Sequence, residues 1–215
     1  MKAIVNVATS QYVYGKKRLR ESLQEHYNGD VYMYDNEYEV ESPTHQENPY
    51  AFKIYAIEKM RQMGYKQVLW LDASVYAVKN VQPLFDWIKE KGFFMEAAGH
   101  WTGTWCNDET LAYFGITRDE AMQMPMFSAG FTGLDFENPI AVEFFEKWKA
   151  SMNAGCFRGN WTNHRHDMTC ASIIANQMGL VRDWSGGGHY FAYIGEGYSQ
   201  PQETVIFHLK CGAVQ

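Results

Sequence analysis

The apolar positions alternate along the chain between the continuous runs typical of buried strands and the three- or four-residue spacing typical of helices. Residues 67–71 read Gln-Val-Leu-Trp-Leu and predict a strand buried on both faces, while Leu19, Leu23 and Tyr27 predict a helix that follows Gly15. The same patterns predict strands over 2–9, 31–34, 93–97, 127–134 and 204–209, and helices over 49–64, 81–90, 138–153 and 167–178.

Strands that alternate with helices predict an α/β fold, a mostly parallel sheet flanked by helices. We expect one domain over residues 1–215, because the chain holds no internal repeat, low-complexity tract or linker. Three segments predict loops: an acidic one over 35–48, an irregular one over 99–125 and a turn-rich one over 183–188. Ligands of such folds bind beyond the carboxyl ends of the strands, so the chemistry is expected there.

Composition narrows the classes of function. Hydrophobic residues make up 46% and charged residues 20%, as in ordinary globular proteins. The net charge of −6 lacks the basic footprint of a nucleic-acid-binding protein. No apolar run is long enough for a membrane span and no signal segment opens the chain, so a cytoplasmic location is expected. The four cysteines have no paired short spacing, which argues against a zinc ribbon or a disulfide framework.

Two stretches carry groups that could bind a cation and a phosphate. Asp72 follows the strand over 67–71, and Ser74 points the same way if the chain stays extended. Oxygen ligands of this kind suit Mg²⁺ or Mn²⁺. Near the other end, strand alternation puts His208 and Lys210 on one side, where they could hold metal and phosphate together. The plainer alternatives are that Asp72 caps a turn and that His208 is a surface residue.

The order of these segments resembles the GT-A glycosyltransferase superfamily over nearly the whole chain, and particularly its small nucleotide-sugar transferases. The resemblance implies that Asp72 opens the family's Asp-x-Asp motif, which binds the divalent ion of the donor, and that His208 completes the coordination. Ser74 stands where the family has the second Asp, so Ser74 would ligate more weakly or through water.

Further segments resemble the family's donor-binding parts. The residues that the resemblance implies are Ala8, Thr9, Tyr12 and Tyr14 in a first nucleotide-binding loop, Lys53 near a helix start, Ser128, Ala129 and Gly130 in place of Asn-Ala-Gly beside the donor sugar, and His166 with Asp167 at the helix that faces the reaction centre. Lys210 would contact the phosphates.

The implied activity is metal-dependent transfer of a sugar, with a hexose expected, from a nucleotide-diphosphate donor to a carbohydrate or other hydroxyl acceptor. UDP is expected as the nucleotide and Mn²⁺ or Mg²⁺ as the cofactor. The ion and Lys210 would stabilise the leaving diphosphate. Asp167 would take the acceptor's proton if the reaction inverts the anomeric configuration, or position the sugar if it retains that configuration. An equal alternative is that Asp167 only caps the helix that it begins.

Several other readings stay open. Trp101, Trp105 and Trp161 could stack on a sugar acceptor or seal the core. The imperfect Asp-x-Ser could mark a lapsed transferase that only binds sugar, nucleotide or a protein partner. The spacing of residues 164–167, His-Arg-His-Asp, is similar to a metallohydrolase signature that then fails at Met168. Nucleotidyl transfer on a related fold would need a glycine-rich basic loop between Ala8 and Gly15, which the sequence lacks.

Overall fold

The computed structural model describes residues 1–180, 191–193 and 206–209. Its main sheet has five strands in the order β2-β1-β3-β6-β5. These are β1 (Lys2–Val7), β2 (Asp30–Tyr34), β3 (Gln67–Leu71), β5 (Phe93–Trp101) and β6 (Pro125–Asp135). Strand β1 is parallel to both β2 and β3, whereas β6 is antiparallel to β3 and β5. Four of the five strands therefore run the same way, which confirms the mostly parallel sheet.

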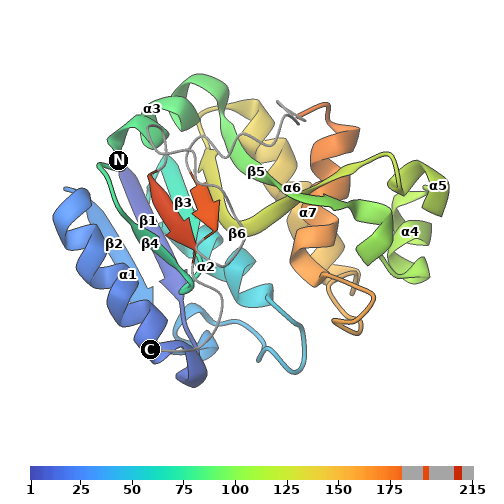
Figure 1. Ribbon diagram of the computed structural model, residues 1–215, viewed down its shortest axis with the longest axis horizontal. Helices are drawn as coiled ribbons and strands as arrows, with labels where there is room; N and C mark the ends of the chain where they lie inside the picture. Colours follow the sequence, from blue (N-terminus) through green and yellow to red (C-terminus); the bar gives the residue numbers. More distant parts are fainter. Residues whose placement is uncertain (181–190, 194–205, 210–215) are drawn as a thin grey trace.

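Helices cover both faces of this sheet (Figure 1). They are α1 (Val13–His26), α2 (Ala51–Gln62), α3 (Gln82–Lys91), α4 (Asp108–Phe114), α5 (Arg118–Ala121), α6 (Pro139–Asn153) and α7 (His166–Gln177), with short 3-10 turns η1 (Ser10–Tyr12), η2 (Glu37–Val40) and η3 (Thr102–Trp105). Val68 and Trp70 of β3 pack in one core with α2, α6 and α7, while Leu69 and Leu71 pack in a second core with α1 and α3. The apolar run of β3 is thus explained by burial on both faces.

A second, three-stranded sheet has the order β4-β8-β7 and brings the end of the described chain beside the segment that follows β3. Strand β4 (Val75–Ala77) follows β3 after a short turn and pairs antiparallel with β8 (Phe207–Leu209), which is parallel to β7 (Phe191–Tyr193). The pairing brings residues far apart in the sequence next to the turn that holds Asp72. Sequence patterns predicted neither β4 nor β7, because three residues show no periodicity.

The predicted boundaries needed three corrections. Helix α2 begins at Ala51 and not at Pro49, because Tyr50 has a left-handed φ of 60° and cannot continue the helix backwards. The segment 99–125, expected to be irregular, contains the end of β5 and two capped helices: Asn107 accepts from Thr110 N at α4, and Thr117 forms a capping box with Glu120 at α5. The acidic loop over 35–48 contains η2.

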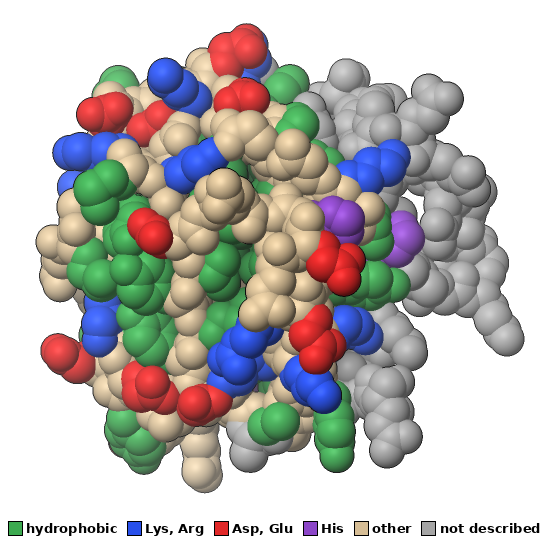
Figure 2. All heavy atoms as spheres, turned by 90° about the vertical axis from the view of Figure 1, so that its left-hand side faces the viewer, with side chains coloured by type: hydrophobic (Ala, Val, Ile, Leu, Met, Phe, Trp, Pro, Cys, Tyr) green, Lys and Arg blue, Asp and Glu red, His purple; other side chains and the backbone are tan. Residues whose placement is uncertain are grey.

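Residues 183–188, and residues 204–205 of the predicted last strand, lie outside the described residues. Within the described part, no helix combines the length and apolar character that crossing a membrane requires. On the face shown in Figure 2, acidic and basic side chains lie interspersed. The described residues on that face form no concentrated basic patch of the kind that attracts a nucleic acid backbone.

Candidate functional site

Three charged side chains from distant segments meet at the carboxyl end of β3. Lys53 lies in the first turn of α2, Asp72 follows β3, and Asp167 lies in the first turn of α7. Lys53 Nζ is 3.2 Å from Asp72 Oδ1, 2.8 Å from Asp167 Oδ2, and donates to the backbone oxygen of Ala129 at 2.9 Å. The contact with Ala129 is a hydrogen bond, and the contacts with the two carboxylates are ion pairs. We call Lys53, Asp72 and Asp167 the charged cluster.

Burial sets the electrostatics of the charged cluster. The side chains of Lys53 and Asp167 are each 3% exposed, whereas Asp72 is 31% exposed. Burial disfavours the charged ammonium, but Asp167 and Asp72 outweigh it, so the pKa of Lys53 is raised and the group stays charged. Burial raises the pKa of Asp167, although Lys53 opposes the shift. Asp167 is therefore a carboxylate that binds a proton more readily than an ordinary aspartate.

Asp72 is held so that one of its oxygens remains for a ligand. Its backbone N donates to the Gly130 oxygen at 2.7 Å, and Trp70 Nε1 donates to Oδ1 at 2.7 Å. Oδ1 thus carries the contacts of both Trp70 and Lys53. Oδ2 faces Gly130, where an added Cβ would lie 3.4 Å from it and 3.4 Å from Ser128 Oγ. The Ser128–Gly130 backbone therefore lies beside Asp72, and its role toward a donor stays a prediction.

The turn from Asp72 to Val75 is fixed by its neighbours. Val75 N donates to Asp72 O at 3.0 Å, and Arg18 Nη2 donates to the backbone oxygen of Ser74 at 3.2 Å. Gly15 of α1 comes so close to this turn that a Cβ there would lie 2.3 Å from Ala73 O. Only glycine permits that approach, so the helix start and the Asp72 turn form one packed unit.

His208 lies on the strand that pairs with the segment leaving this turn. It is opposite Tyr76 in the register of β4 and β8, and the two rings are 5.5 Å apart and perpendicular. Burial, and then the charge of Lys79, lowers the pKa of His208. The imidazole is consequently neutral near pH 7, the form that ligates a metal. Lys210 lies outside the described residues.

The donor atoms suit a hard divalent cation only if the substrate supplies further ligands. Within the described residues, no group of three or more His, Cys, Asp or Glu side chains could hold a metal ion. Asp72, Ser74 and neutral His208 provide one carboxylate, one hydroxyl and one imidazole. Mg²⁺ and related ions are commonly bound by one or two carboxylates together with substrate phosphates and water. A cation held by these residues would therefore need further ligands from a bound diphosphate and water.

The predicted nucleotide loop lies at the same edge of the sheet. Strands β1 and β3 are parallel neighbours, so the residues after Val7 and after Leu71 leave the sheet side by side. Ala8 is buried and its N donates to Tyr34 O at 3.1 Å, and Thr9 is half-buried. Tyr14 is 60% exposed at the start of α1. Its ring is available to a ligand at the edge that also carries Asp72.

His166 belongs to a group of rings next to Asp167. Its backbone has a left-handed φ of 48°, and Nδ1 donates to Phe157 O at 2.7 Å. The ring lies 5.5 Å from that of Tyr50 and is stacked 5.5 Å from that of Trp161. Burial lowers the pKa of His166, so the ring is neutral. The family resemblance identified His166 but not its aromatic neighbours Tyr50 and Trp161. It also missed the hydrogen bond from Trp70 to Asp72, although two residues that are two positions apart in an extended chain point the same way.

The histidines of residues 164–167 do not form a metal centre. His164 is fully buried; its Nε2 donates to Cys156 O at 2.8 Å and its Nδ1 accepts from Asn107 N at 3.3 Å. Both ring nitrogens are therefore engaged, and burial lowers the pKa of His164 to about 4. The metallohydrolase alternative is wrong for this segment.

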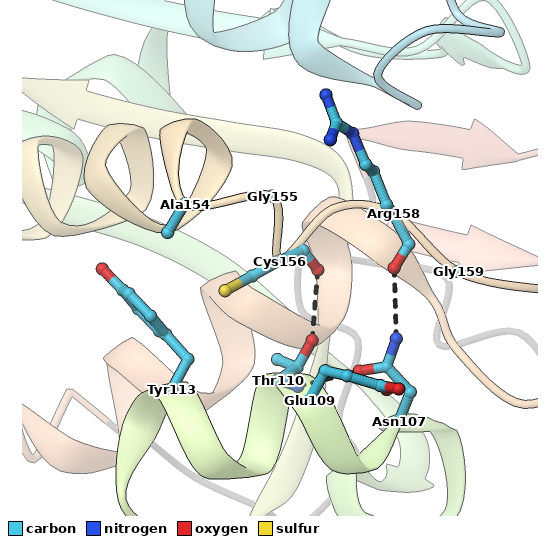
Figure 3. A pocket seen from close by; sticks show the side chains of 9 residues that line it. All are labelled: Asn107, Glu109, Thr110, Tyr113, Ala154, Gly155, Cys156, Arg158 and Gly159. Carbon is cyan, nitrogen blue, oxygen red and sulfur yellow. Dashed lines mark hydrogen bonds between the residues drawn. The ribbon is translucent and has the colours of Figure 1, made fainter.

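A separate pocket of about 360 Å³ lies between α4 and the connection from α6 to α7 (Figure 3). Its walls are tied by two hydrogen bonds, from Thr110 Oγ1 to Cys156 O at 3.3 Å and from Asn107 Nδ2 to Arg158 O at 3.1 Å. None of its lining residues belongs to the charged cluster or to the predicted site. The chemistry-bearing residues therefore gather elsewhere, at the edge of the main sheet.

The fold is similar to that of solved glycosyltransferases. The bifunctional glycosyltransferase WbbM matches 97% of this chain with a TM-score of 0.61 and 12% identity, but the chain spans only 45% of that structure. Mouse xyloside xylosyltransferase 1 matches with a TM-score of 0.56 and 12% identity, covering 98% of both chains. A glycosyltransferase involved in glycosylation of the major capsid of PBCV-1 gives 0.54 and 13%, with coverage of 98% and 93%.

The likeness lies in the fold and not in the sequence. No family model matches the chain, and no curated protein matches it. The structural matches nevertheless confirm the glycosyltransferase-like fold that the order of the sequence segments predicted.

Proposed function

We propose that this protein transfers a sugar from a nucleotide-diphosphate donor, with UDP as the nucleotide, to a hydroxyl acceptor. The single observation that carries the proposal is the charged cluster, in which Lys53 joins Asp72 to Asp167 at the edge where α/β sheets bind their ligands. The glycosyltransferase-like fold makes sugar transfer the reaction that best accounts for two carboxylates at that edge.

The donor would lie across the loop after β1 and the Ser128–Gly130 backbone. Ala8 and Thr9 would offer backbone groups to the nucleotide, and Tyr14 would stack on the base. Lys53 would act indirectly, because its ammonium is buried and already pairs with Asp72 and Asp167. Its role would be to hold Asp72 and Asp167 in place beside the donor.

A divalent cation, Mn²⁺ or Mg²⁺, would be held by Asp72 Oδ2, Ser74 and His208. When bound, the cation would neutralise charge on the departing diphosphate. The chain's own contribution would be to present one oxygen of Asp72 while Trp70 and Lys53 hold the other, and to keep His208 neutral. Lys210, outside the described residues, would contribute a positive charge to the phosphates.

Asp167 would serve the reaction in one of two ways. In an inverting transfer it would accept the acceptor's proton, a role that its raised pKa suits. With only 3% of its side chain exposed, the acceptor hydroxyl would reach it only after a rearrangement of the side chains around it. In a retaining transfer Asp167 would position the donor sugar and need no such access. The anomeric configuration of the product, followed by NMR, decides between them.

The experiment offers the purified protein a panel of nucleotide sugars with Mn²⁺ and varied acceptors and measures release of nucleoside diphosphate. We expect release with a UDP-sugar, abolished by Asp72→Ala and strongly reduced by His208→Ala. No release from any donor with any acceptor would contradict the proposal.

A catalytically lapsed binding protein of the same fold is the second candidate. Ser74 in place of a carboxylate favours it, as does the lack of a three-ligand metal group among the described residues. This candidate predicts that UDP or a UDP-sugar binds while no donor is consumed, so the two outcomes separate in the same experiment.

A further inference from the structure

We infer, on the premise of the proposed function, that the acceptor is a saccharide whose pyranose ring packs against Trp161 and whose hydroxyls meet Arg165. Trp161, Arg165 and His166 form what we call the acceptor wall. It stands beside Asp167 at the start of α7, in the connection that leads from α6.

Trp161 combines high exposure with a fixed position. Half of its surface, 50%, is exposed, which contradicts a role in sealing the core. Its ring is stacked on that of His166 at 5.5 Å with 22° between the planes, and lies 6.2 Å from that of Tyr50. An indole that neighbouring rings already hold loses little freedom when a ligand packs on it, so its apolar surface contributes to affinity efficiently.

Arg165 gives the wall its hydrogen-bond donors. Its guanidinium carbon lies 3.8 Å from the ring centre of Trp105 and 4.1 Å from that of Trp161, so the planar group sits between two indoles. Its backbone N donates to Trp105 O and to Thr169 Oγ1, both at 3.1 Å, and Nη1 donates to Trp161 O. A guanidinium has five N–H donors in a rigid fork, which leaves further donors at the rim of the stack.

The wall is continuous with the charged cluster. Arg165, His166 and Asp167 are consecutive, and the ring of Tyr50 lies 5.5 Å from that of His166. Lys53 Nζ in turn lies 5.2 Å from the centre of the Tyr50 ring. The side chains of His166 and Tyr50 therefore form an unbroken series of contacts from the exposed part of Trp161 to Lys53, which pairs with Asp167. This is the position from which an acceptor hydroxyl would approach the proposed reaction centre.

The surface chemistry matches a pyranose more closely than a peptide. A pyranose presents C–H groups, which suit the part of the Trp161 indole that Arg165 and His166 leave exposed, and a rim of hydroxyls, which suits guanidinium donors. The neutral ring of His166 brings no charge that such an uncharged ligand would have to desolvate. A single exposed indole offers no sheet edge or apolar groove of the kinds that bind peptides.

The test measures saccharide binding separately from donor chemistry. Saturation-transfer NMR would titrate methyl β-glucoside, methyl β-galactoside, methyl β-xyloside, lactose and cellobiose against the parent protein, Trp161→Ala and Arg165→Met. We expect at least one saccharide to bind the parent, with its C–H protons nearest the protein. The dissociation constant of the saccharide should rise about tenfold or more in Trp161→Ala, as for an aromatic side chain that the ligand buries on binding. It should also rise in Arg165→Met.

Tyr38→Ala is the matched control, because Tyr38 is an aromatic side chain 71% exposed on η2, an element that contributes no residue to the wall. It should leave saccharide binding unchanged, and all three variants should keep the parent's affinity for UDP with Mn²⁺. The inference would be overturned if the parent bound no saccharide, or bound a serine- or threonine-containing peptide instead. It would also be overturned if Trp161→Ala bound saccharide as tightly as the parent does. Saccharide binding at Trp161 without any UDP affinity would instead overturn the proposed function and leave this site standing.

Discussion

Replacing Lys53 by methionine removes the one positive charge that, among the described residues, contacts both carboxylates of the cluster, and it keeps a similar side-chain length. Asp167 would then be a buried carboxylate without a charged partner among the described residues that contact it. Asp72, which keeps its bond from Trp70 and is 31% exposed, would be affected less. The variant should therefore fold with a stability deficit that comes mainly from Asp167.

The magnitude follows from burial. Removing one partner from a buried ion pair costs about 3–5 kcal/mol. Both Lys53 and Asp167 are 3% exposed, so the full range applies to that pair, whereas the exposed Asp72 adds little. At about 2–4 °C per kcal/mol for a chain of this size, the melting temperature should fall by about 6–20 °C. Because protonation neutralises Asp167, the deficit should shrink as the pH falls through its raised pKa.

Urea unfolding followed by circular dichroism at pH 7 measures the effect. Lys147→Met is the matched control: Lys147 pairs with Glu143 at 2.7 Å on the exposed face of α6, and its loss should cost at most about 0.5 kcal/mol. Adding Asp167→Asn to Lys53→Met should recover at least about half of the deficit, since the buried charge is then gone. A deficit below about 1 kcal/mol, or a double variant no more stable than Lys53→Met, would refute the electrostatic account.

Three further predictions concern pH and packing. If Asp167 is the base, the acid limb of kcat/KM should lie above the ordinary aspartate pKa, because activity is lost as pH falls through the raised pKa of Asp167; a limb at or below pH 3.8 would count against this role. His164 alone should reduce the free energy of unfolding by about 3 kcal/mol as the pH drops from 6.5 to about 4, because the unfolded chain binds a proton that the buried neutral ring does not. His164→Gln should flatten that slope in urea titrations, and an unchanged slope would argue against this contribution. Gly15→Ala should cost about 1–3 kcal/mol and weaken UDP binding with Mn²⁺ in calorimetry, because its Cβ would displace the Ala73 backbone; parent-like values for both would contradict the tight packing.

Local sequence signals predicted the parts of the fold that depend on local pattern. The run over Val68–Leu71 identified β3, and its end placed Asp72 at the ligand edge of the sheet. Lys53 and Asp167 were found through the family resemblance as separate residues near helix starts. The ammonium of Lys53 contacts both Asp72 and Asp167 because of the way α2 and α7 pack against β3. No spacing in the sequence encodes that packing.

Other features needed the three-dimensional structure for specific reasons. Strand β4 is three residues long and is defined by its pairing with β8, more than a hundred residues later. The left-handed Tyr50 has no sequence signature, since glycine is the residue expected there. Sequence patterns left the role of Trp161 open, and its exposure together with the stack on His166 indicates a surface role.

The account depends most on a cation joining Asp72 and His208 to a donor diphosphate. Isothermal titration calorimetry of UDP into the parent protein, with and without Mn²⁺, tests this directly. The account predicts clearly tighter UDP binding with Mn²⁺ and no such gain in Asp72→Ala. The same UDP affinity in both buffers would contradict it.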